Sequence, residues 1–103
     1  MDINAEELKN KLSSEEDFVL IDVREPWEYE EFNLGGQLMP LGNLMQDVTE
    51  LSVDKNKEII VCCRSGQRSG MAKSILIQMG YTNVRNLLGG IMDWQSKFGS
   101  EKI

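Results

Sequence analysis

Two nearly continuous apolar runs, FVLIDV at residues 18–23 and EIIVCC at 58–63, constrain the fold of this chain more than any other feature. A strand that faces solvent on one side alternates apolar and polar residues, whereas a strand buried on both faces is apolar throughout. Helix signals lie before, between and after these runs, at residues 4–12, 26–32, 42–50, 69–79 and 91–98. Strands that alternate with helices indicate a parallel sheet with helices on both faces. The 103 residues are enough for one such domain, over residues 1–103.

Local signals refine the boundaries of several elements. Asn4 is a typical N-cap residue, and Glu7 three positions later completes a capping-box-like start. Pro26 suits the first turn of a short helix. QLMPL at 37–41 and NVRNL at 83–87 are expected to be short additional strands of the same sheet.

The segment VCCRSGQRSG at residues 61–70 is the strongest candidate for a functional site. In parallel sheets, ligands bind beyond the carboxyl ends of the strands, where Cys63 and, after the other buried strand, Arg24 are expected to lie. Gly66 allows the loop to curl so that the N–H groups of residues 64 to 69 converge above the Cys63 sulfur. A helix start and the two arginines of this loop would add positive charge, which stabilises a thiolate and binds an oxyanion. The same residues are also compatible with a plain strand-to-helix turn whose arginines face solvent.

The two adjacent cysteines have different expected environments. Strand alternation either sends Cys62 and Cys63 to opposite faces of the sheet or leaves Cys62 in the sheet and Cys63 at its rim. We expect Cys62 to be a small buried residue of the core. The chain contains no histidine, so Cys63 has no imidazole base, and the two cysteines cannot form a zinc site. We therefore predict no metal and a Cys63 thiol that is ionised by its surroundings.

Net charge and hydropathy exclude several classes of partner. The formal net charge of −6 argues against binding to nucleic acid or to an anionic membrane, because both need a basic surface. No apolar run approaches the ~20 residues of a membrane span, and the first residues, MDINAEELKNK, do not resemble a signal peptide. The expected location is the cytoplasm, where cysteines remain reduced.

Three motifs, IDVREPWEYEEF, VCCRSGQRS and GYTNVRNLLGGIMDW, in this order and spacing resemble a single-domain rhodanese, a sulfurtransferase. The resemblance spans nearly the whole chain and implies an α/β fold with a five-stranded parallel sheet and helices on both faces. It implies no cofactor, and it implies that Cys63 carries sulfane sulfur as a persulfide. The donor would be a small anion such as thiosulfate, and the acceptor cyanide or a thiol, including a protein thiol. The residues that would complete the cradle of Cys63 and bind the donor are Arg64, Ser65, Gly66, Gln67, Arg68 and Ser69.

Other positions of the motifs have supporting or structural interpretations. Asp22 and Arg24 match the family's Asp-Val-Arg segment, which braces the active site, although an ordinary surface ion pair is the alternative. Trp94 and Trp27 are both expected in the core. Where relatives usually have His-Ile-Pro-Gly-Ala, this chain has Asn33-Leu34-Gly35-Gly36-Gln37. We expect this segment to be more flexible and, as part of a wall near the active site in relatives, to alter substrate preference.

Two alternative functions share the same loop chemistry. Cysteine-dependent phosphatases and arsenate reductases also hold a thiolate in a ring of amides, but the phosphatases place five residues between Cys and Arg. Here four residues lie between Cys63 and Arg68, which favours a single sulfur atom over a tetrahedral phosphate. A carrier that delivers persulfide sulfur to a protein partner is the second alternative.

Overall fold

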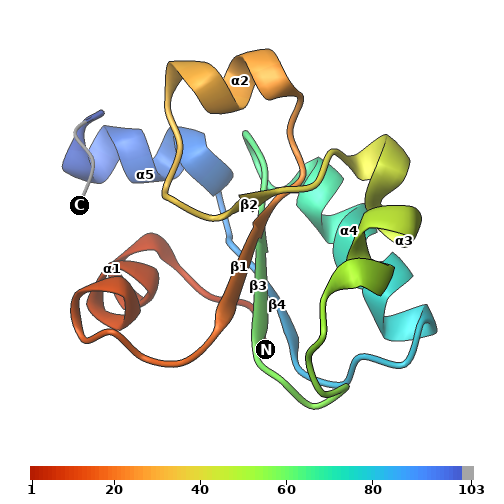
Figure 1. Ribbon diagram of the computed structural model, residues 1–103. Coiled ribbons are helices and arrows are strands. Elements are labelled where there is room, and N and C mark those ends of the chain that lie inside the picture. The colour runs from red at the N-terminus through yellow and green to blue at the C-terminus, as the bar shows by residue number, and fades with distance from the viewer. Residues whose placement is uncertain (101–103) are drawn as a thin grey trace.

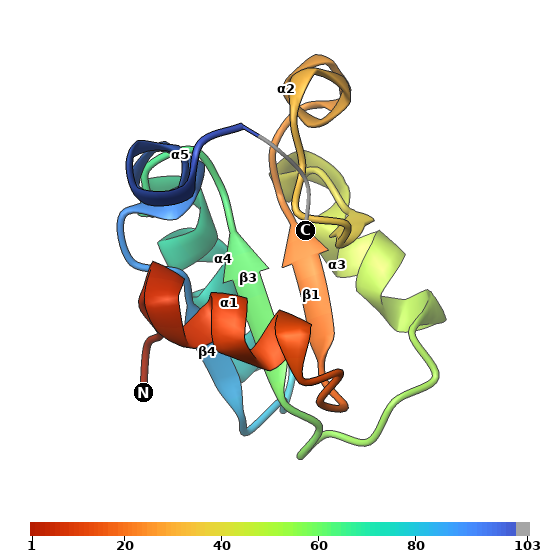
Figure 2. The same ribbon diagram turned by 90° about the vertical axis from the view of Figure 1, so that its left-hand side faces the viewer.

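The computed structural model describes residues 1–100 as a parallel sheet between two layers of helices (Figure 1). In chain order the elements are α1 (Ala5–Ser13), β1 (Val19–Asp22), α2 (Pro26–Glu31), β2 (Gln37–Leu38), η1 (Leu41–Asn43), α3 (Leu44–Asp47), η2 (Val48–Glu50), β3 (Ile59–Cys62), α4 (Gln67–Gln78), β4 (Val84–Asn86) and α5 (Gly90–Phe98). Helices α1 and α5 cover one face of the sheet, and α3 and α4 cover the other (Figure 2). The short helix α2 stands beyond the ends of the strands (Figure 1). No helix in the described part of the chain is long and apolar enough to cross a membrane.

The strand order is β2-β1-β3-β4, and all neighbouring strands are parallel. The prediction of an α/β fold with a parallel sheet is confirmed, but residues 1–100 form four strands instead of five. A single parallel bridge between Ile3 and Leu87 stands where a fifth strand would pair with β4. The chain leaves the sheet after Ile3 because the next residue, Asn4, already caps α1. The Asn4 side chain accepts a hydrogen bond from the Glu7 N–H at 2.8 Å.

The two buried strands divide the core into two apolar clusters, one on each face. The cluster under α3 and α4 includes Ile21, Val61 and Cys63, and the cluster under α1 and α5 includes Ile60 and Cys62. Both runs are therefore buried on both faces, as their continuous apolar sequence predicts. Of the two arrangements open from the sequence, the structure has the cysteines on opposite faces, with Cys63 just past the end of β3. The predicted burial of Cys62 is confirmed.

The two tryptophans differ in burial. Trp94 on α5 is completely buried and packs edge-to-face against Phe98, at 5.0 Å between the ring centroids. Trp27 was also expected in the core, but 62% of its surface is exposed, so that prediction is wrong. The reason is the position of α2, a six-residue helix at the end of the sheet in which only Glu28 is buried.

Candidate active site

The cysteine loop begins at the carboxyl end of the central strand β3. Cys62 is the last residue of β3, Cys63 follows it, and α4 begins at Gln67. Gly66 is the N-cap of α4 and has φ 103°, a left-handed conformation that glycine adopts without a steric penalty. The loop therefore turns as the sequence predicts, although the helix begins two residues before the expected Ser69.

Several hydrogen-bond donors converge on the Cys63 sulfur. The Gly66 N–H donates to Sγ at 3.1 Å, and the Ser69 Oγ lies 3.3 Å from Sγ. Burial alone would raise the pKa of Cys63. Hydrogen bonds from the Ser69 hydroxyl and from the N–H groups of Ser69, Gly66 and Ser65 outweigh burial and hold this pKa below its ordinary value. The loop thus favours the thiolate, the nucleophilic form of cysteine.

Cys62 lies next in sequence but in an opposite environment. Burial on the α1 and α5 face raises the pKa of the Cys62 thiol, and the nearby Asp22 carboxylate raises it further. Cys62 therefore stays a neutral thiol, whereas Cys63 is biased toward ionisation.

The two arginines of the loop have different surroundings. Arg68 forms a bidentate ion pair with Glu28 of α2, from Nη1 to Oε1 at 2.7 Å and from Nη2 to Oε2 at 2.8 Å. This pair lowers the pKa of Glu28 to about 2 and raises the pKa of Arg68. Arg64 is exposed and forms no salt bridge within residues 1–100. It lines a cavity of about 350 Å³ together with Trp27 of α2 and Met92 of α5.

The remaining members of the predicted cradle have mixed roles in the structure. Ser69 is completely buried beside the sulfur. The side chains of Ser65 and Gln67 are exposed, so Ser65 contributes to the sulfur through its backbone N–H.

Asp22 and Arg24 form a buried ion pair at the end of β1. The Arg24 Nη2 lies 2.8 Å from the Asp22 Oδ2, and the exposed fractions of the two residues are 4% and 1%. The surface ion pair that was the alternative interpretation is therefore excluded. Arg24 also donates to the Phe32 carbonyl oxygen at 2.6 Å, which ties the end of α2 to β1. Arg24, which is oriented by Asp22, thus holds the end of α2, the helix that carries Glu28.

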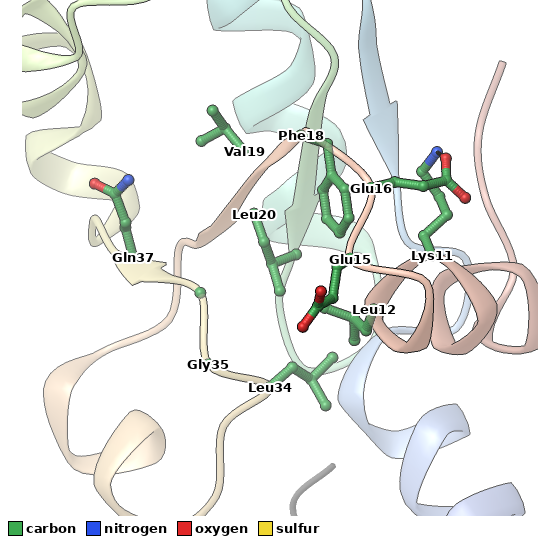
Figure 3. Close-up of a pocket in the computed structure, with 11 residues that line it drawn as sticks. Lys11, Leu12, Glu15, Glu16, Phe18, Val19, Leu20, Leu34, Gly35 and Gln37 are labelled. Atoms are coloured by element: carbon green, nitrogen blue, oxygen red, sulfur yellow. Dashed lines mark hydrogen bonds and ion pairs between the residues drawn. The ribbon is translucent and has the colours of Figure 1, made fainter.

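Most of the segment 33–37 lines a cavity next to α1. The Asn33 side chain accepts from the Gly35 N–H at 2.9 Å and donates to the Tyr29 carbonyl oxygen at 3.0 Å. Leu34 and the following residues line a second cavity against Leu12 at the end of α1 (Figure 3). In this chain the segment therefore forms a wall of a cavity next to α1, and its predicted effects on flexibility and substrate choice remain predictions.

Asn86, at the end of β4, was not identified from the sequence. Its Oδ1 lies 2.5 Å from the Ser69 Oγ, and its Nδ2 donates to the Gly66 carbonyl oxygen at 3.1 Å. A polar residue at the carboxyl end of a predicted strand was the only available signal, because such positions meet at one edge of the sheet.

The glycine pair at the start of α5, Gly89 and Gly90, packs against the backbone of the cysteine loop. The Ile91 N–H donates to the Cys63 carbonyl oxygen, and the Met92 N–H donates to the Arg64 carbonyl oxygen, both at 2.9 Å. Gly90 has φ 61°, and a Cβ atom there would lie 2.6 Å from the Cys63 carbonyl oxygen. Only glycine allows this close approach between the turn and the loop.

The chain is similar to rhodanese-like proteins both in sequence and in structure. Residues 4–97 match the model of the rhodanese-like domain family. The chain is 35% identical over 94 residues to a sulfurtransferase of Allochromatium vinosum, covering 90% of this chain and 86% of that protein. It is 40% identical over 74 residues to thiosulfate sulfurtransferase PspE of Escherichia coli, covering 71% of this chain and 70% of PspE.

Two further matches extend the range of relatives. A Bacillus subtilis protein named "Putative sulfur carrier protein YrkF" is 37% identical over 97 residues, covering 93% of this chain, and the match spans about half (51%) of YrkF. The solution structure of the rhodanese-like domain of Alr3790 from Anabaena has a TM-score of 0.85 at 28% identity, covering 99% of this chain and 79% of that one.

Proposed function

This chain belongs to the rhodanese-like family, whose members include sulfurtransferases, and from this premise we propose that it transfers sulfane sulfur through a persulfide on Cys63. One observation carries the proposal: hydrogen-bond donors surround the Cys63 sulfur, whereas the neighbouring Cys62 thiol is buried on the other face of the sheet. The donor is thiosulfate or a similar small anion, and the acceptor is cyanide or a thiol.

The reaction proceeds in two displacements at sulfur. The Cys63 thiolate attacks the outer sulfur of thiosulfate, the new S–S bond forms, and sulfite leaves with the electron pair of the bond that breaks. The acceptor then attacks the outer sulfur of the persulfide. Cyanide leaves as thiocyanate, or a thiol acceptor becomes a persulfide, and the Cys63 thiolate is regenerated.

The cradle supplies the electrostatic stabilisation for both steps. The N–H groups of Ser65, Gly66 and Ser69 face the sulfur, where negative charge is present before and after each displacement. Arg64 is the arginine whose charge is free to attract an anionic donor in the part of the chain described here. Arg68 shares its charge with Glu28, so its contribution to donor binding is smaller and its contribution to loop geometry is larger.

A carrier role is supported by the likeness to YrkF and by the exposed side chains of Trp27 and Met92, which line the cavity beside Arg64. In this version the acceptor is a thiol of a protein partner, and the chemistry at Cys63 is the same. Both versions require the Cys63 persulfide, so a single assay tests their common step.

The test compares Cys63→Ser with Cys62→Ser in a thiosulfate:cyanide assay. We expect Cys63→Ser to abolish the formation of thiocyanate and Cys62→Ser to retain most of it, because only Cys63 lies in the ring of donors. Circular dichroism verifies that both variants are folded. Equal loss of activity in a folded Cys62→Ser protein would contradict the assignment.

A further inference from the structure

The Ser69 hydroxyl has one proton and two neighbours that compete for it. Its Oγ lies 2.5 Å from the Asn86 Oδ1 and 3.3 Å from the Cys63 Sγ. A serine hydroxyl donates one hydrogen bond and accepts up to two, and a thiolate can only accept. The Ser69 hydroxyl therefore cannot donate fully to both neighbours. Whether it donates to Asn86 or to Cys63 depends on the charge of the sulfur.

The position of the Asn86 amide is fixed by contacts on both sides. Its Nδ2 donates to the Gly66 carbonyl oxygen at 3.1 Å, which orients Oδ1 toward Ser69. Its backbone N–H donates to the Asp2 Oδ1 at 2.9 Å, and its carbonyl oxygen accepts from the Ile3 N–H at 3.0 Å. Asn86 thus presents a rigid acceptor to Ser69 from the neighbouring strand, β4.

We propose that Asn86 is a positioning residue that controls the nucleophile by competing with the Cys63 sulfur for the Ser69 proton. While Cys63 is a thiol, its S–H donates to the Ser69 oxygen and Ser69 donates to Asn86. When the thiol proton is lost to solvent, the Ser69 hydroxyl rotates and donates to the thiolate, because a hydrogen bond to a charged acceptor is stronger. The role in catalysis rests on the proposed function, whereas the proton competition does not.

Charged side chains lie on each segment that carries or adjoins Cys63, Ser69 and Asn86: Arg64 in the loop, Arg68 and Lys73 on α4, Glu28 on α2, Asp22 at the end of β1, Arg24 just after it, Arg85 on β4, Asp93 on α5 and Asp2 before α1. Six of them form ion pairs with one another: Arg68 with Glu28, Arg24 with Asp22, and Lys73 with Asp2. Asn86 contacts the Asp2 carboxylate only through its backbone N–H. A substitution of the Asn86 side chain therefore leaves these pairs in place.

Two substitutions of Asn86 should shift the reactivity of Cys63 in opposite directions. Asn86→Asp replaces the amide oxygen with a carboxylate, which is a stronger acceptor for the Ser69 proton. The thiolate then loses this hydrogen bond, so the midpoint of the pH profile of Cys63 alkylation should rise by about one pH unit or more. Asn86→Leu has a similar shape but no acceptor, so Ser69 donates to the sulfur alone and the midpoint should fall. A role limited to holding the loop in place would raise the midpoint in both variants.

The measurement is the rate of alkylation by iodoacetamide as a function of pH, in a Cys62→Ser background that leaves Cys63 as the one thiol. Asn83→Asp is the matched control, because it makes the same change at an exposed residue just before β4, at the end of the strand opposite to Asn86, and should leave the midpoint in place. In a Ser69→Ala background, the downward shift of the midpoint caused by Asn86→Leu should disappear, because alanine has no hydroxyl proton to donate to the sulfur.

The outcomes separate the two proposals. Shifts of both Asn86 variants in the same direction, or a downward shift of Asn86→Leu that persists without the Ser69 hydroxyl, would overturn the inference. If Asn86→Asp does not fold, Asn86→Leu with and without Ser69 still decides the question. Alkylation needs no thiosulfate, so a wild-type protein that forms no persulfide would refute the proposed function and leave this result intact.

Discussion

Replacing Glu28 with glutamine should destabilise the protein in a way that depends on pH. Glu28 lies on α2, is 8% exposed and binds both Nη atoms of Arg68 on α4. Its Oε1 also accepts from the Glu25 N–H at 3.0 Å. Glutamine retains the size of the side chain and an oxygen for Glu25, but it removes the charge and places an NH₂ group against the guanidinium of Arg68.

The magnitude follows from the pKa of Glu28. A fall in this pKa from 4.5 to about 2 corresponds to at most about 3 kcal/mol of stability. Because 32% of the Arg68 side chain is exposed and solvent screens that end of the pair, we expect Glu28→Gln to cost about 1–2 kcal/mol at neutral pH. A carboxyl group with a lowered pKa stabilises the fold above its unfolded-state pKa, and this contribution is lost as the pH falls. The difference between wild type and Glu28→Gln should therefore be constant above about pH 5.5 and shrink between about pH 4.5 and pH 2.

Urea unfolding of both proteins across this pH range measures the difference directly. Glu30→Gln is the matched control, because Glu30 is an exposed residue of the same helix and should show no comparable penalty. A penalty for Glu28→Gln that stays constant down to about pH 2 would refute the reasoning, since it would arise from shape or from the bond to Glu25 instead of the charge.

Two further predictions concern the loop arginines and the end of α1. Arg64→Ala should lower kcat/KM for thiosulfate about tenfold with little change in stability. Arg68→Ala should lower both the activity and the urea midpoint, because it leaves the buried Glu28 carboxylate unpaired. Equal stability of the two variants would contradict this division of roles. Glu15→Gly should stabilise the fold by about 0.5–1 kcal/mol, because Glu15 has φ 55° just after the C-cap of α1, where glycine is favoured. A urea midpoint below that of the wild type would show that the left-handed backbone at Glu15 carries no strain.

The sequence was most informative where the signal was local. The apolar runs at 18–23 and 58–63 specified β1 and β3 because each residue of a doubly buried strand must be apolar. Gly66, Pro26 and the N-cap Asn4 were predictable for the same reason, since each meets a requirement of its own backbone position.

Contacts between distant segments could not be predicted in this way. Arg68 was identified, but its partner Glu28 is 40 residues away in a run of similar acidic residues, and only the packing of α2 over the loop selects it. Asn86 lies 17 residues from Ser69, and nothing in its own strand distinguishes it from a residue that faces solvent. Trp27 was assigned to the core by its residue type, but α2, the helix that carries it, lies at the end of the sheet with its outer side open to solvent.

The measurement that tests the central proposal most directly is the mass of the protein after incubation with thiosulfate. The wild type should gain one sulfur atom, about 32 Da, which reducing agents remove and which peptide analysis assigns to Cys63. Cys62→Ser should gain the same mass, and Cys63→Ser should gain none. A wild-type protein that gains no sulfur yet hydrolyses aryl phosphates rapidly, or a sulfur found on Cys62, would contradict a Cys63 persulfide as the working form of this protein.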